Sequence, residues 1–309
     1  MGVLVLLPLV APVTAWPVAR LAERHLHPRL GAQVLTATGA VLAACSTLCL
    51  VLLAIVGTAQ LPGNPLPDGW SDPQVRQAVP HSALLGKASI IALSAVAMAT
   101  YGAVRRHYQV RGAAQRALHG IRRTSVVVLP DAVPYAHTVP DVHGPIVVST
   151  AMLAGLSSRE RRALFAHERA HLRRRHHRYL LTVRLAARAN PFLLPLRDAV
   201  TYCVERWADE EAAHAVGDRR LTARAVGRAA LISTGPPAAT WAAFAATGPV
   251  PRRVEALLAP PPLPRLWTRF SARFGLAAGS AVAGTALSAL SSANSTITLL
   301  LILKAATPW

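Results

Sequence analysis

Two histidines four residues apart, with a glutamate directly after the first, are the residues of this sequence best placed to do chemistry together. They are His167, Glu168 and His171. On a helix, where successive residues turn by about 100°, His171 lies about 40° around from His167, so both imidazoles point into one site and Glu168 lies beside them. Neutral imidazole is a good ligand for Zn²⁺. The pattern therefore predicts a zinc site with its base on the same helix.

A catalytic zinc ion commonly has three protein ligands and keeps one position open for water, so a third ligand must come from another part of the chain. Glu205 is the best candidate, and Cys203, which stands alone near it, is the alternative. Asp209 follows Glu205 by four residues and so lies on the same helical face. From there its carboxylate can orient a ligand histidine through the free N–H of the ring.

A helix must carry the two histidines, and the sequence indicates where it starts and stops. Ser157 and Glu160 form a capping-box pattern that predicts a helix start about three turns before His167. Helix-forming residues continue from Arg159 to Ala189, and Asn190 followed by proline ends the helix. The motif is therefore expected in the middle of one long helix.

Two further histidines, His176 and His177, follow on this predicted helix. On a continuous helix they lie about 180° and 280° around from His167, away from the ligand face. Together with Arg173, Arg174 and Arg175 they are predicted to form a solvated or lipid-headgroup face rather than a second metal site.

The combination of H-E-x-x-H with a later E-x-x-x-D resembles the gluzincin metallopeptidases. Three flanking segments are similar to the membrane-embedded antirepressor peptidases of the BlaR/MecR type, with HtpX/Ste-type peptidases as cousins; they are residues 159–164, 205–212 and 252–258. The resemblance extends over residues 1–303. It implies a zinc-dependent endopeptidase in which His167, His171 and Glu205 hold zinc, Glu168 is the general base and Asp209 orients a ligand.

Composition indicates a membrane protein. Of the 309 residues 52% are hydrophobic and the mean hydropathy is +0.35, which is too apolar for an ordinary soluble protein. The net charge is +19, and nucleic-acid binding is one explanation for it. However, no basic motif interleaved with aromatic residues supports that explanation, whereas cytoplasmic loops carry positive charge beside anionic lipid. The expected partner is therefore the lipid bilayer and not nucleic acid.

Four apolar blocks predict membrane-crossing helices, since about 20 residues cross the hydrocarbon core. Arginines flank the predicted inner ends, so the positive-inside rule places both termini outside and the central domain in the cytoplasm of a plasma-membrane protein. The predicted blocks are residues 2–19, 33–57, 83–104 and 274–303, with an external loop over 58–81. The predicted organisation is three transmembrane helices in 1–104, a cytoplasmic zinc metallopeptidase domain in 105–272, and a fourth transmembrane helix with a short external tail in 273–309.

Three short strands are predicted before the motif helix, over residues 125–129, 134–139 and 145–149. In zincins an edge strand at this place holds an extended substrate by backbone pairing. The alternative is a small sheet that only packs against the helix. The predicted fold class is thus an α-helical membrane protein with a cytoplasmic α+β zincin-like (gluzincin) domain.

The predicted function is zinc-dependent cleavage of a protein or peptide. The resemblance implies a cytoplasmic winged-helix repressor as substrate, although the extracellular β-lactam-binding sensor domain of the BlaR-type pattern is not found after the fourth block, so direct antibiotic sensing is not expected. HtpX-like quality control is the alternative. A signalling scaffold with structural zinc does not need Glu168, and a transporter does not fit the scarcity of polar residues in the first three blocks. The sequence predicts no oligomeric state.

The residue that stabilises an oxyanion during cleavage is not identified by spacing. Several polar residues near Glu205 compete for this role, and each is also compatible with an ordinary surface position. They are Tyr202, His214, Arg219 and Arg220.

Overall fold

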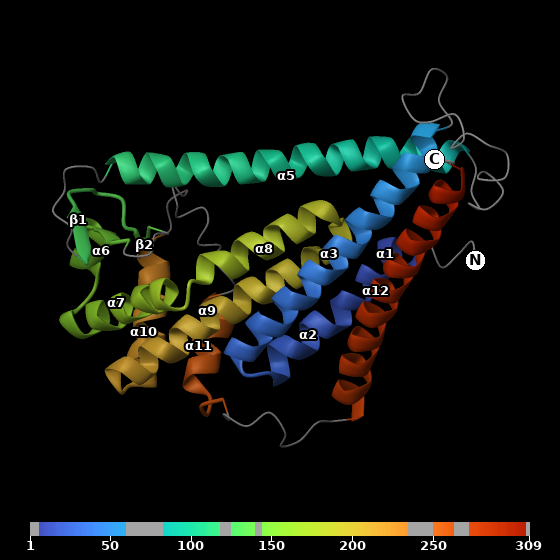
Figure 1. The fold of residues 1–309 in the computed structure, drawn as a ribbon. Coiled ribbons are helices and arrows are strands. Elements are labelled where there is room, and N and C mark those ends of the chain that lie inside the picture. The colour runs from blue at the N-terminus through green and yellow to red at the C-terminus, as the bar shows by residue number, and fades with distance from the viewer. Residues whose placement is uncertain are drawn as a thin grey trace.

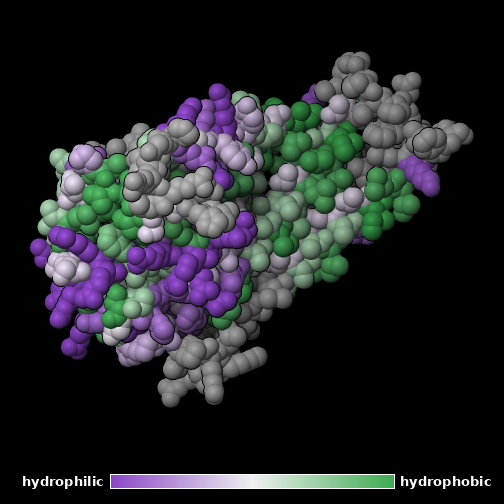
Figure 2. Space-filling model, turned by 60° about the vertical axis from the view of Figure 1, so that its left-hand side comes forward, coloured by the Kyte–Doolittle hydropathy of each residue, from purple (hydrophilic) through white to green (hydrophobic). Residues whose placement is uncertain are grey.

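The computed structural model describes six stretches of the chain, and within them the protein is mostly helical with one small sheet (Figure 1). Long helices lie side by side at one end, and the sheet and shorter helices gather at the other. Figure 2 shows the corresponding surface, with hydrophobic residues dominating the narrower arm and hydrophilic residues concentrated on the broader end. The described residues are 6–59, 83–117, 125–139, 144–233, 250–262 and 272–306.

Three long helices make up the apolar arm: α3 (Pro28–Ala59), α5 (Ala83–Ala117) and α12 (Ala272–Ala306). Helix α3 contacts both α5 and α12. Within the described residues, Pro28–Ala59 and Leu84–Ala117 are long and apolar enough to cross a bilayer; they contain the predicted block 33–57 and all but the first residue of the predicted block 83–104. The predicted block 274–303 lies in one continuous helix, α12.

The N-terminal block differs from the single helix that its composition suggests. It forms α1 (Leu7–Val10), a 3₁₀ segment η2 (Ala11–Thr14) and α2 (Ala15–His25). Pro8 and Pro12 stand at the starts of the first two segments, and proline lacks the N–H that a continuous helix needs. Helix α2 then packs against α3 and against α9 (Leu194–Val216).

The predicted strands are confirmed as β1 (Val126–Leu129), β2 (Ala136–Thr138) and β3 (Ile146–Ser149). The order is β1-β3-β2, with β1 parallel and β2 antiparallel to β3, so β1 and β2 are the edges of the sheet as described. Helix α6 (Thr150–Gly155) follows directly, and Ser149 caps it by accepting from the Met152 N–H at 3.1 Å. Strand β2 contacts the next helix, α7.

Helix α7 (Ser158–Arg173) begins as predicted, since the Ser157 hydroxyl accepts from the Glu160 N–H at 3.4 Å and the Glu160 carboxylate accepts from the Ser157 N–H at 2.8 Å. The predicted continuation to Ala189 is wrong. A turn at Arg174 and Arg175 separates α7 from α8 (His176–Ala189), and Arg175 has φ +53°, in the left-handed region that a helix cannot include.

A short 3₁₀ segment, η4 (Pro191–Leu193), joins α8 to α9, which is followed by α10 (Arg219–Ile232) and, later in the chain, α11 (Val250–Leu258). Helices α8 and α9 pack on α2 and α3 in one apolar core. Asn190 ties this core together by donating to the Ser46 hydroxyl at 2.9 Å and to the Leu9 carbonyl at 3.1 Å. Helix α9, which carries Glu205, is therefore packed at its start against helix α3 of the apolar arm.

Some predicted features fall outside or across the described elements. The predicted domain boundary at residue 104 lies inside the continuous helix α5. Residues 60–81 of the predicted external loop and the C-terminal tail after Ala306 lie outside the described residues, so their predicted positions are untested.

Candidate metal centre

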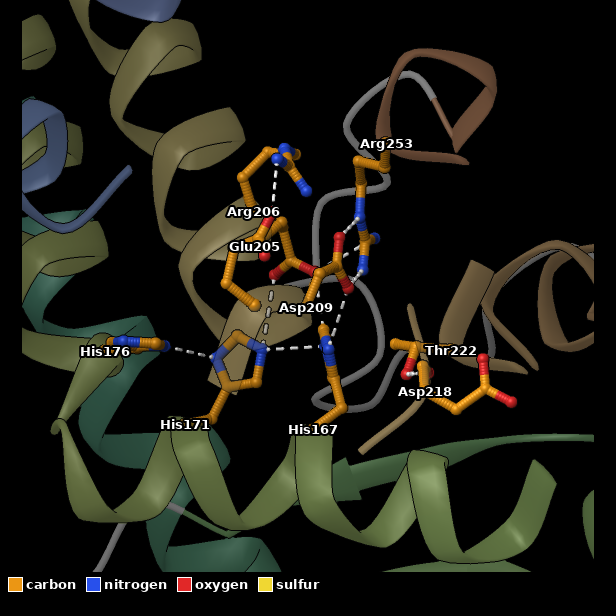
Figure 3. A network of polar contacts seen from close by, with 10 residues as sticks. His167, His171, His176, Glu205, Arg206, Asp209, Asp218, Thr222 and Arg253 are labelled. Carbon is orange, nitrogen blue, oxygen red and sulfur yellow. Dashed lines mark hydrogen bonds and ion pairs between the residues drawn. The ribbon is translucent and has the colours of Figure 1, made fainter. Parts of the chain in front are cut away.

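Helices α7 and α9 bring the three predicted zinc ligands together (Figure 3). The Nε2 atoms of His167 and His171 are 3.1 Å apart. The Glu205 carboxylate reaches both rings, with Oε2 3.6 Å from His167 Nε2 and Oε1 3.6 Å from His171 Nε2. Their ligand atoms all lie within 4.8 Å of one another, so residues almost forty positions apart share one site.

These distances suit a tetrahedral zinc ion. Bonds of about 2.0–2.1 Å to nitrogen and oxygen place neighbouring ligand atoms about 3.3 Å apart. The two histidine nitrogens are 3.1 Å apart, close to this value, and each lies 3.6 Å from a different oxygen of Glu205. The alternative ligand Cys203 is buried in the apolar core beside Gly31, and it is not part of the cluster.

Asp209 lies one turn after Glu205 and is fully buried. Its Oδ1 is 3.0 Å from His167 Nδ1, a close ion-pair contact that lacks the angle of a regular hydrogen bond. Burial disfavours a charged His167, but Asp209 and Glu205 outweigh burial and raise the pKa of the ring to about 10. Metal binding at His167 would therefore displace a proton. Asp209 is therefore close enough to His167 to orient it, and its orienting role stays a prediction.

Glu168 is buried beside the ligands, and burial raises the pKa of its carboxyl to about 7. A base works best when its pKa is near the working pH, because it is then both ionised and able to accept a proton. The two neighbouring motif residues therefore differ in environment. Two carboxylates raise the pKa of His167, whereas loss of contact with water is the main cause of the raised pKa of Glu168.

His176 joins the cluster, contrary to the prediction that it lies on a solvated face. Its Nδ1 is 3.1 Å from His171 Nδ1, and the side chain is fully buried. The left-handed turn at Arg175 restarts the helix in a new direction, which returns His176 to the ligand side. No glycine, asparagine or proline marks this turn, so the sequence contains no local signal for it.

Arg253 is a second residue of the cluster whose contacts the sequence did not predict. It comes from α11, and its Nε and Nη2 donate to the Asp209 carboxylate at 2.8 and 2.7 Å while Nη1 lies 3.1 Å from Glu205 Oε2. Burial opposes ionisation of both carboxyls, but the guanidinium outweighs it and holds the pKa of Glu205 and of Asp209 below their usual range. In the sequence, the one signal at Arg253 is its place in segment 252–258, which resembles the antirepressor peptidases.

The four oxyanion candidates are not drawn into the cluster. Arg219 donates to the carbonyls of Ala256 and Leu257 at 2.9 and 3.1 Å, which fastens the end of α11. The Tyr202 ring lies 4.4 Å from the Arg252 guanidinium. His214 and Arg220 are exposed.

Comparison with known proteins supports the same chemistry. Residues 103–195 match the model of peptidase family M48, and this stretch contains His167, Glu168 and His171. No curated protein and no solved structure matches the chain. The match supports a metallopeptidase of the M48 family, and the cluster of His167, His171 and Glu205 is compatible with its metal site.

Proposed function

We propose that this chain is a membrane-bound, zinc-dependent endopeptidase whose active site faces the cytoplasm. One observation carries the proposal: two histidines of an H-E-x-x-H motif meet a glutamate from a separate helix within 4.8 Å, and the glutamate that follows the first histidine in the sequence is buried. The match to peptidase family M48 over the same motif supports it.

In this proposal His167, His171 and Glu205 hold the zinc ion. Zinc supplies Lewis-acid chemistry, which polarises the scissile carbonyl and makes water acidic enough to attack near neutral pH. Glu168 takes the proton from the attacking water and returns it to the nitrogen of the leaving amine. Asp209 keeps the His167 ring in place, and Arg253 holds the Glu205 and Asp209 carboxylates in their ionised, ligand-ready form.

We propose that the substrate is an extended peptide that pairs with strand β2. This strand is an edge of the described sheet and contacts α7, the helix that carries both histidines. An edge strand offers unpaired backbone N–H and C=O groups, so a peptide can add to it as a further strand. Backbone pairing also explains how an enzyme can bind different sequences at one place.

The activity is tested with purified full-length protein and an unfolded protein substrate. Glu168→Gln should lower the cleavage rate about 10²–10⁴-fold while zinc content stays the same, because the ligands are untouched and only proton transfer is removed. Glu255→Gln, at an exposed position on α11, is the matched control and should be fully active. Full activity of Glu168→Gln would exclude the mechanism and favour a scaffold with structural zinc.

The membrane part of the proposal is that α3, α5, α12 and the N-terminal helices cross the bilayer with both termini outside. Large apolar side chains are exposed along α5 and α12, as expected for helices in lipid; they include Leu84, Ile91, Met98, Leu290, Ile297 and Leu301. Exposed arginines, among them Arg105, Arg106 and Arg116, follow toward the end of α5, which favours the cytoplasm there.

Cysteine labelling in intact cells tests this topology. Arg116→Cys and Arg169→Cys replace exposed residues and should react only after the membrane is permeabilised. Pro65→Cys and Trp309→Cys should react with an impermeant reagent in intact cells. Reaction of Arg169→Cys in intact cells would move the active site outside and turn the substrate search toward envelope proteins.

The substrate in the cell is proposed to be a DNA-binding repressor, because the segments around the motif resemble antirepressor peptidases. The alternative is quality control of damaged membrane proteins. The two differ in breadth, since a regulator cuts one protein whereas a quality-control enzyme cuts many. Comparing the proteomes of cells with wild-type and Glu168→Gln protein should show one repressor stabilised in the variant; broad accumulation of misfolded membrane proteins would support the alternative.

A further inference from the structure

We propose that His176 is a positioning residue for the metal centre, holding the ligand ring of His171 through a hydrogen bond between their Nδ1 atoms. The two atoms are 3.1 Å apart, and the ring centroids are 4.8 Å apart in an edge-to-face arrangement. Figure 3 shows His176 on the opposite side of His171 from Glu205. His176 is therefore placed to support a ligand and not to bind the metal itself.

The direction of this hydrogen bond follows from the ligand geometry. His171 Nε2 faces His167 and Glu205, so its lone pair is directed to the metal and the ring proton must sit on Nδ1. That N–H is buried and needs an acceptor. The lone pair of His176 Nδ1 provides one, which places the proton of His176 on its own Nε2, a buried atom without a hydrogen-bond partner among the described residues.

The metal centre then has one orienting partner for each histidine ligand. Asp209 lies 3.0 Å from His167 Nδ1, and His176 lies 3.1 Å from His171 Nδ1. Partners of this kind fix the tautomer and the angle of a ligand ring, and their loss commonly weakens metal binding about 10–100-fold. One partner is a carboxylate and the other a neutral ring, so only the first adds charge to the site.

The surroundings of His176 fix its ring in this position. It is fully buried and packs on the Trp207 indole, with ring centroids 4.7 Å apart. Trp207 lies two residues after Glu205 on α9 and donates from Nε1 to Glu211 at 3.3 Å. Helix α9 thus carries both the proposed ligand Glu205 and the Trp207 ring that packs against His176. The turn at Arg175 supplies the remaining constraint, since it directs His176 inward.

Two variants of full-length protein separate the hydrogen bond from packing. His176→Leu has a similar volume but no acceptor, whereas His176→Asn is smaller but keeps an acceptor atom at the position of Nδ1. Zinc affinity is measured by competition with a chromophoric chelator, and the Co²⁺-substituted protein gives a visible spectrum that reports ligand geometry. His176→Leu should bind zinc about 10–100-fold more weakly with an altered Co²⁺ spectrum, and His176→Asn should stay within a few-fold of wild type.

Equal zinc affinities of His176→Leu and wild type would overturn the proposal, as would an Asn variant as weak as the Leu variant. If His176→Leu does not fold, His176→Asn is compared with His176→Ala, and equal affinities of these two would overturn it. The inference rests on the proposed zinc site, but the two fail separately. Wild-type protein that binds no zinc contradicts the proposed function, whereas wild-type zinc binding that does not depend on residue 176 contradicts only this inference.

Discussion

The polar cluster and the α3–α5 contact are held together by opposite means. In the polar cluster, defined by His167, His171, His176, Glu205, Asp209 and Arg253, helices α7, α8, α9 and α11 meet through buried charges and hydrogen bonds. In the α3–α5 contact, Gly57 and Gly86 bring two backbones so close that a Cβ built on Gly57 would lie 2.5 Å from the Gly86 carbonyl oxygen. The polar cluster depends on paired charges and hydrogen bonds, whereas the α3–α5 contact depends on two glycines that have no side chain.

This difference predicts which substitutions each region tolerates. A buried charge that loses its partner is left without compensation, and the cost is several kcal/mol even when size is preserved. The close contact of two glycines has no charge to leave unpaired, but an atom added there pushes the two helix backbones apart. The polar cluster should therefore respond to the type of side chain, and the α3–α5 contact should respond to its size.

The largest expected effect comes from removing a metal ligand. His167→Ala and Glu205→Ala should each weaken zinc binding by more than about 10²-fold, because losing a ligand costs more than losing its orienting partner. Cys203→Ala is the control, since Cys203 lies in the apolar core and should leave zinc content unchanged. Metal content is measured by elemental analysis of purified protein, and unchanged zinc in Glu205→Ala would show that the third ligand is another residue.

Arg253 and Arg252 offer a matched pair of adjacent arginines. Arg253→Met leaves the Asp209 and Glu205 carboxylates buried beside each other, so it should lower the free energy of unfolding by about 3–5 kcal/mol. Arg252 pairs with Glu23 at 2.7 Å, but its side chain is 45% exposed, so Arg252→Met should cost about 0–1 kcal/mol. Denaturant unfolding of both variants measures the loss in free energy of unfolding. Equal losses would mean that burial does not make the Arg253 contacts more stabilising than the exposed Arg252 pair.

The α3–α5 contact is tested by adding a single methyl group. Gly57→Ala should gain up to about 1 kcal/mol in helix propensity but lose about 1–3 kcal/mol to overpacking against Gly86, for a net loss. On α5, Gly102 has no neighbouring atom within 4 Å of the position that a Cβ would take, so Gly102→Ala should be neutral or stabilising. Thermal unfolding in detergent compares them, and two neutral variants would indicate that the helices separate easily.

The smallest expected effect concerns the start of α7. Ser157→Ala removes the acceptor for the Glu160 N–H and should lower the free energy of unfolding by about 1 kcal/mol. The ligands stay in place, so zinc affinity should be unchanged. Ser158→Ala, one residue further along the helix, is the control. A loss of zinc binding in Ser157→Ala would contradict this expectation, because it would show that the positions of the ligands depend on the cap at the start of α7.

Local patterns predicted much of this arrangement correctly. The ligand pair His167 and His171 follows from the helical repeat, and the start of α7 follows from the Ser157–Glu160 capping box, because both depend on neighbours within one or two turns. The three strands were predicted from short apolar runs between turn-forming residues. Glu205 was selected by the need for a third ligand, and α9 brings it to both histidines.

Spacing and caps are local, so they were enough to predict that His167 and His171 share one helix face, that α7 begins after Ser157, and roughly where the three strands lie. The packing of distant parts of the chain was needed to show that α7 ends at Arg173, that His176 lies against His171, and that Arg253 reaches Asp209 from α11. The turn at Arg175 contains no residue type that predicts a turn, and Arg253 is 44 residues from Asp209 in the sequence. Such contacts form because buried polar groups must find partners, and which partner is near depends on how distant helices pack.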